Sequence, residues 1–135
     1  MRLLVDTHAW LWFLLTPDRL AEPARDALSD RRNHLWLSVA SQREIVIKCG
    51  IGRLELPEPP SVFLPSRLAA TECGVLPVEQ RHVLRLESLP LHHRDPFDRI
   101  IIAQALTDDL VIVTGDPAFP SYDVPLLWAA RHAAP

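Results

Sequence analysis

Cysteine, basic charge and long apolar runs are scarce in this sequence, and each shortage excludes a class of protein. The two cysteines, Cys49 and Cys73, fit no metal-ligand or redox spacing, so we expect free, buried thiols. The net charge of −3 lacks the basic excess typical of nucleic-acid-binding proteins, so such a role would need clustered arginines or acids masked by a metal ion. No apolar run could span a bilayer and the N-terminus lacks a signal-peptide pattern, so we expect a cytoplasmic protein with no membrane partner.

The composition is that of one folded domain. At 135 residues, with 48% hydrophobic and 23% charged residues, the chain can form a layered core, and we expect a single domain over 1–135 with a mobile tail at 129–135. Lys48 is the only lysine, and the other basic residues are arginines, whose planar guanidinium suits phosphate and carboxylate partners.

Short apolar runs alternate with helical patterns along the chain. This alternation predicts an α/β fold with a parallel sheet covered by helices on both faces. Ser41 and Glu44 have the spacing of a capping box, which predicts a helix start there and an end at Gly50. The expected strands lie at 2–5, 34–37, 75–76, 110–113 and 126–127.

Four acids are predicted to meet at the carboxyl edge of this sheet, where ligands of α/β proteins collect. Asp6 and Asp116 follow strands, whereas Glu44 and Asp98 are expected in the first turns of helices. Four carboxylates at one edge would repel one another unless a cation lay between them. Because the ligands would be oxygens, the pattern favours Mg²⁺ or Mn²⁺ over zinc.

Each acid also has a purely structural interpretation. Glu44 could close the capping box, Asp6 could cap the first helix, and Asp116 could be a turn residue. Asp98 could complement a helix dipole. However, Asp95 followed by Pro96 is itself a helix start, so Asp98 is not needed as the cap and is left as a candidate ligand.

Basic side chains near the same edge are candidates for binding phosphate, although exposed arginines are commonly only solvated. The three histidines near these positions are interpreted as a packed helix residue (His8) and as loop residues (His92 and His93). The phosphate-binding candidates are Arg43, Lys48, Arg94 and Arg99.

Motifs in a fixed order cover nearly the whole chain: LVDTH at 4–8 with WLW at 10–12, EIVIK at 44–48, GRLELP at 52–57, HRDPFDRIIIAQ at 93–104 and TGDPAF at 114–119. Together they resemble the PIN-domain ribonucleases, and more narrowly the VapC toxins of bacterial VapBC toxin–antitoxin systems. The resemblance implies a three-layer α/β/α fold with strand order 3-2-1-4-5.

The resemblance also implies roles for individual residues. Asp6, Glu44, Asp98 and Asp116 fall on the four acidic active-site positions of the family, with Asp6 and Asp98 as the most direct metal ligands. Glu44 and Asp116 would bind the metal directly or through water. Thr114 matches a hydroxyl position that supports the last acid.

The function so implied is that of a toxin: an Mg²⁺-dependent endoribonuclease that hydrolyses RNA phosphodiester bonds with a metal-activated water. The implied partners are an RNA substrate and a VapB-type antitoxin, whose tail lies across the acidic edge in relatives. The apolar segment 8–15, with two tryptophans, additionally favours a homodimer unless the sheet covers it fully.

One departure and two rival functions bear on this expectation. Gln42 and Arg43 stand where relatives often carry an apolar residue and Trp, which affects local packing, the antitoxin contact or substrate preference. The main alternative is a PIN-like module that binds RNA or protein without cutting. A phosphatase of the haloacid-dehalogenase type would need an aspartate at the position of His8, so that interpretation is weak.

Overall fold

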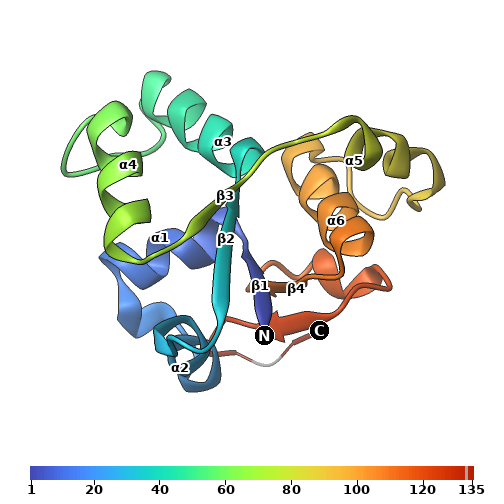
Figure 1. Ribbon diagram of the computed structural model, residues 1–135, viewed down its shortest axis with the longest axis horizontal. Coiled ribbons are helices and arrows are strands. Elements are labelled where there is room, and N and C mark those ends of the chain that lie inside the picture. Colours follow the sequence, from blue (N-terminus) through green and yellow to red (C-terminus); the bar gives the residue numbers. More distant parts are fainter. Residues whose placement is uncertain (133) are drawn as a thin grey trace.

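The computed structural model describes residues 1–132 and 134–135. At its centre is a parallel five-stranded sheet with strand order β3-β2-β1-β4-β5, in which Leu4 of β1 aligns with Trp36 and Ile112 (Figure 1). The predicted α/β class, parallel sheet and strand order are therefore confirmed. The strands are β1 (Arg2–Val5), β2 (His34–Ser38), β3 (Gly74–Leu76), β4 (Val111–Thr114) and β5 (Leu126–Trp128).

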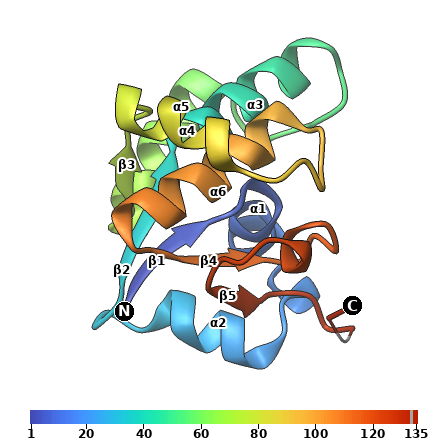
Figure 2. The ribbon, with the colours of Figure 1, turned by 90° about the vertical axis from the view of Figure 1, so that its right-hand side faces the viewer.

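Helices cover both faces of the sheet. The ribbon places α1, α2 and α4 on one side and α5 and α6 on the other, with α3 beyond the carboxyl edge (Figures 1 and 2). Among the described residues, none of the helices has the length and apolar character that a membrane span requires. The helices are α1 (Thr7–Leu15), α2 (Glu22–Ser29), α3 (Val39–Gly50), α4 (Pro60–Ala70), α5 (Gln80–Arg85) and α6 (Pro96–Asp108), with 3₁₀ turns η1 (Pro17–Arg19), η2 (Leu86–Ser88) and η3 (Phe119–Ser121).

Strand β1 separates two apolar cores because alternate side chains point to opposite faces. Leu3 and Val5 belong to the core that contains Trp10 of α1. The ring of Trp10 packs edge-on against that of Phe63 in α4, with 6.1 Å between the ring centroids. Leu4 belongs to the other core, under α6. Because both faces of β1 are buried, its sequence is an uninterrupted apolar run. Packing on both faces also determines the position of the strand's carboxyl end.

Helix α6 begins where the sequence predicts. The side chain of Asp95 accepts hydrogen bonds from the backbone N–H groups of Phe97 (2.8 Å) and Asp98 (3.2 Å), and Pro96 is the first helical residue. Asp109 ends the helix with a left-handed φ of 54°. The cap is therefore Asp95, which leaves the carboxylate of Asp98 available for another role.

The predicted start of α3 is wrong. Ser38, at the end of β2, is the N-cap, and its hydroxyl accepts a hydrogen bond of 3.0 Å from the backbone N–H of Ala40. The helix thus begins before Ser41, because the serine that ends the strand already has the extended backbone that a cap requires. As a result, Glu44 lies in the second turn instead of the first, and it closes no capping box.

The end of the chain is packed at least through Ala130. Ala129 accepts a hydrogen bond from the N–H of Ala21 and donates one to the carbonyl of Thr114, both at 2.8 Å. Ala129 and Ala130 are buried, and the mobility of 129–135 stays a prediction. Residue 133 of that segment lies outside the described residues.

A polar clamp joins α5 to the end of α6. His82 is fully buried, and its Nδ1 accepts from the N–H of Glu79 at 2.9 Å while its Nε2 lies 2.8 Å from Oδ2 of Asp108. The guanidinium of Arg81 also binds Asp108, at 3.1–3.2 Å. The clamp holds α5 against the helix that carries Asp98.

We expect Asp108→Ala to lower the free energy of unfolding by roughly 1–3 kcal/mol, because it leaves the buried Nε2 of His82 without a partner. Urea unfolding followed by circular dichroism measures this loss. Asp26→Ala, at an exposed position of α2, is the matched control and should change stability by less than about 0.5 kcal/mol. Equal losses in the two variants would contradict the clamp.

Candidate metal centre

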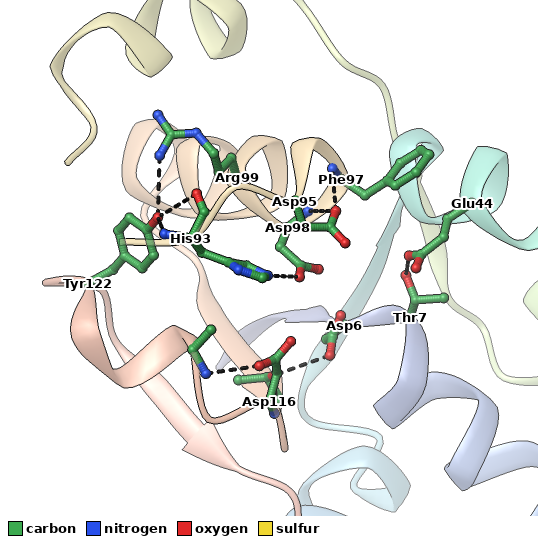
Figure 3. A network of polar contacts seen from close by, with 12 residues as sticks. Asp6, Thr7, Glu44, His93, Asp95, Phe97, Asp98, Arg99, Asp116 and Tyr122 are labelled. Atoms are coloured by element: carbon green, nitrogen blue, oxygen red, sulfur yellow. Dashed lines mark hydrogen bonds and ion pairs between the residues drawn. The ribbon is translucent and has the colours of Figure 1, made fainter. Parts of the chain in front are cut away.

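Three aspartates converge beyond the carboxyl ends of the two central strands (Figure 3). Asp6 directly follows β1, Asp116 follows β4 after one residue, and Asp98 stands in the first turn of α6. One ligand atom from each of His93, Asp98 and Asp116 lies within 4.8 Å of the others, and Asp6 is not part of this group. The topology thus brings together acids that are as much as 110 residues apart in sequence (6 to 116).

The side chain of Asp6 forms a hydrogen bond with Thr114 and does not cap α1. Its side chain makes no capping hydrogen bond, although it occupies the N-cap position. Instead, its Oδ2 accepts from the hydroxyl of Thr114 at 3.0 Å, and the same hydroxyl accepts from the backbone N–H of Asp116 at 3.1 Å. Thr114 therefore ties the carboxylate of Asp6 to the loop of Asp116.

Asp116 has both a structural contact and a place in the cluster. Its Oδ1 accepts from the N–H of Ala118 at 2.9 Å, as expected for an aspartate that begins a turn. The carboxylate nevertheless stays half-buried beside Asp98 and raises the pKa of both other aspartates. The turn interpretation and the ligand interpretation are thus compatible.

Asp98 has a partner that the sequence did not reveal. Nε2 of His93 lies 2.7 Å from its Oδ2, and in Figure 3 the carboxylate stands between His93 and Asp6. His93 is a loop residue, as the sequence predicts, but its ring reaches the candidate site. Its position five residues before Asp98, next to a helix start, is the only signal in the sequence.

Glu44 is buried near Asp6, but both of its carboxylate oxygens have protein partners. The hydroxyl of Thr7 donates to Oε1 at 2.7 Å, and Nζ of Lys48 pairs with Oε2 at 2.6 Å. Thr7 was not among the predicted site residues. Lys48, which we expected to bind substrate phosphate, is in this structure the counter-charge of Glu44, one helical turn away.

The three arginines predicted to bind phosphate differ in their surroundings. Arg43 is exposed, with its guanidinium 5.4 Å from the centroid of the Phe97 ring. Arg94 is exposed on the loop before α6. Arg99 does not fit the prediction, because its guanidinium donates to the backbone carbonyls of residues 89–90 and is thereby committed to holding that loop. Arg43 and Arg94 remain candidates.

The electrostatics of the cluster call for a cation. Burial raises the pKa of Asp6 from 3.8 to about 7, helped by the charges of Glu44 and Asp116 and opposed by the hydrogen bond from Thr114. Burial and the neighbouring charge of Asp6 likewise raise the pKa of Asp98 to about 7. These carboxylates resist ionisation because burial removes them from water and the neighbouring carboxylates repel their charge.

The donor set fits a hard divalent cation. Carboxylate oxygens of Asp98 and Asp116 lie close together beside one nitrogen of His93, and no described cysteine lies in the group. Mg²⁺ and Mn²⁺ prefer such oxygen ligands. A bound dication would restore the ionised state that the burial of Asp6 and Asp98 disfavours.

Comparisons with known proteins agree with this fold. The family model described as "PIN domain" matches residues 3–125. Ribonuclease VapC16 of Mycobacterium tuberculosis is 38% identical over 58 residues, which span 43% of this chain and 40% of that protein.

Solved structures share the fold at low sequence identity. VapBC2 from Rickettsia felis, bound to a promoter DNA fragment, has a TM-score of 0.73 at 14% identity and covers 96% of this chain and 99% of its own. DNA-bound VapBC from Salmonella typhimurium has a TM-score of 0.67 at 16% identity, with coverages of 94% and 97%. FitAcB from Neisseria gonorrhoeae has a TM-score of 0.55 at 20% identity, with coverages of 93% and 96%.

Proposed function

The chain belongs to the PIN domain family, and on that premise we propose that it is a metal-dependent endoribonuclease that hydrolyses RNA phosphodiester bonds. The observation that carries the proposal is the cluster of Asp6, Asp98 and Asp116, in which the pKa of two buried carboxyls is raised to about 7. A fold gains nothing from such a cluster by itself, because burying like charges is costly unless they are compensated. A cation site explains why the acids lie together.

Asp6 and Asp98 would hold Mg²⁺ or Mn²⁺, and Asp116 and Glu44 would contribute directly or through water. A cation bound there would polarise a phosphodiester and make water a stronger nucleophile at neutral pH. The protein's own part is to orient these carboxylates, through Thr114 for Asp6 and through Thr7 for Glu44. No side-chain nucleophile is required.

Positive charge for the RNA backbone would come from the rim of the site. Arg43 and Arg94 are exposed there, and Lys48 can exchange its contact with Glu44 for a phosphate once a cation compensates the acids. Arginine forks suit phosphate oxygens. RNA binding through these groups should weaken steeply as salt rises.

The proposed biological role is that of the toxin in a VapBC-type toxin–antitoxin pair, acting in the cytoplasm. The support is the name of the M. tuberculosis relative and the fold shared with the toxin–antitoxin structures above. A VapB-type antitoxin and a second copy of this chain are the proposed protein partners. Trp10 of α1 is fully buried by the chain's own core, whereas residues 12–15 of the same helix are only partly buried and leave apolar surface for a second copy. Light scattering would measure the mass.

The test is RNA cleavage by the purified chain with Mg²⁺ or Mn²⁺. We expect EDTA to lower the rate by at least about a hundredfold and excess metal to restore it, because the cation supplies most of the stabilisation of developing charge. An Asp98→Asn variant purified in parallel controls for contaminating ribonuclease. RNA binding without cleavage would favour the non-catalytic module, and sequencing the 5′ ends of cut RNA would identify the target.

A further inference from the structure

We propose that His93 is a positioning residue that fixes the orientation of the Asp98 carboxylate for metal binding, and that Arg99 and Tyr122 pin the loop that carries it. This inference rests on the proposed metal-dependent function and adds a residue outside the four acids. Its observations are a chain of hydrogen bonds from α6, through the loop 89–94 and back to α6 (Figure 3).

The first link is the contact between the imidazole and the carboxylate. Nε2 of His93 lies 2.7 Å from Oδ2 of Asp98, with the two side chains 28% and 11% exposed. The terminal torsion of an aspartate is soft, so a buried carboxylate without a partner can rotate away from a useful direction. The bond to Oδ2 removes that freedom and leaves Oδ1 for a cation. Partners of this kind typically strengthen metal binding tenfold to a hundredfold.

The second link holds His93 itself. Its backbone N–H donates to the hydroxyl of Tyr122 at 2.8 Å, and Tyr122 is almost fully buried. Tyr122 is the only tyrosine of the chain and lies 29 residues further along. The loop 89–94 has no regular structure. It is attached, through the backbone of His93, to Tyr122 in the apolar core under α6.

The third link returns to α6. Nη1 of Arg99 donates to the Tyr122 hydroxyl at 3.3 Å and to the carbonyl of Pro90 at 2.8 Å, and Nη2 donates to the carbonyl of Leu89 at 3.3 Å. Arg99 follows Asp98 directly, so the helix that presents the carboxylate also anchors the loop that orients it. Arginine suits this task because its fork places several donors in a fixed plane.

A purely structural role accounts poorly for this arrangement. The start of α6 is already capped by Asp95, so the fold does not need the His93–Asp98 bond to begin the helix. A role as metal ligand is a different hypothesis, because a nitrogen that donates its proton to Asp98 has no lone pair for a cation. The positioning role and the ligand role of His93 differ in which substitutions of this residue should preserve metal binding.

The experiment measures Mn²⁺ binding without RNA, by calorimetry on the full chain. We expect His93→Ala to weaken binding about tenfold or more. His93→Gln, whose amide can still donate to Oδ2, should stay within about threefold of the unmodified protein. Leu91→Ala, at a position of the same loop that is 69% exposed, is the matched control and should bind normally. Tyr122→Phe keeps the buried ring and removes the hydroxyl, so it should weaken binding a few-fold.

Three results would overturn the assignment. Unchanged Mn²⁺ affinity in both His93→Ala and Tyr122→Phe would remove His93 from the site. Equal losses in the Ala and Gln variants, or nitrogen coupling from His93 in the spectrum of bound Mn²⁺, would make it a ligand. If the unmodified protein binds Mn²⁺ but does not cut RNA, the nuclease proposal fails while the role of His93 stands, so the two failures are distinguishable.

Discussion

Asp6→Asn is expected to lower metal-dependent RNA cleavage by at least about a thousandfold, or roughly 4 kcal/mol of transition-state stabilisation. Asparagine keeps the shape of the side chain and can still accept from Thr114, but it loses the charge that the proposed cation needs. The same change should stabilise the metal-free protein at pH 8, because a buried carboxylate whose pKa is raised to about 7 no longer has to ionise. Loss of activity together with gain of stability is the signature of a functional acid.

Two measurements check this expectation: initial rates on a labelled RNA with excess Mg²⁺, and thermal unfolding in EDTA at pH 8. Asp95→Asn is the matched control, since it removes a carboxylate from the same edge while asparagine still caps α6. It should cut RNA within a few-fold of the normal rate. An Asp6→Asn protein that cut RNA at full rate would refute the proposed site.

The metal-free protein is expected to lose stability as the pH rises from about 4 to about 7. The folded-state pKa of Asp6 and Asp98 is raised above the ordinary value of 3.8, so the folded chain binds more protons than the unfolded chain within this window. The free energy of unfolding therefore falls as the pH rises, by an amount on the order of a few kcal/mol, and levels off above the folded pKa.

Divalent metal should reverse this trend, because it binds only the ionised carboxylates of the folded state. Excess Mg²⁺ or Mn²⁺ should raise the unfolding temperature at pH 8 far more than at pH 5. Thermal scans between these pH values, in EDTA and in metal, make the comparison, and Asp6→Asn should flatten both curves. A metal-free protein that became steadily more stable between pH 5 and pH 8 would contradict the raised pKa values.

The sheet could be predicted because burial on both faces leaves a plain sequence signature. Strand β1 is an apolar run ending in Asp6, and the alternation of such runs with helices leaves few topologies. The start of α3 could not be predicted as safely, because Ser38 and Ser41 are both capable caps. Only the point where β2 ends decides between them, and that point depends on pairing with the neighbouring strands.

In the candidate site, too, the features that depend on local sequence could be predicted and those that depend on distant residues could not. Asp6 and Asp98 could be placed from local signals. The spacing of four residues between Glu44 and Lys48 on one helix permits their ion pair, but we predicted phosphate binding for Lys48 instead. The surroundings of His93 and Arg99 were not readable, since both depend on Tyr122, which is distant in sequence. Charge near an edge can be inferred from the sequence, whereas the direction in which a guanidinium points cannot.

The hydrogen bond between Ala129 and Thr114 also has a consequence for how much of the chain's end can be lost. Thr114 holds Asp6 with its hydroxyl and Ala129 with its carbonyl, so the residue after β5 lies two contacts from a proposed ligand. Removal of the chain's end as far as Ala129 would therefore release the backbone that supports Thr114.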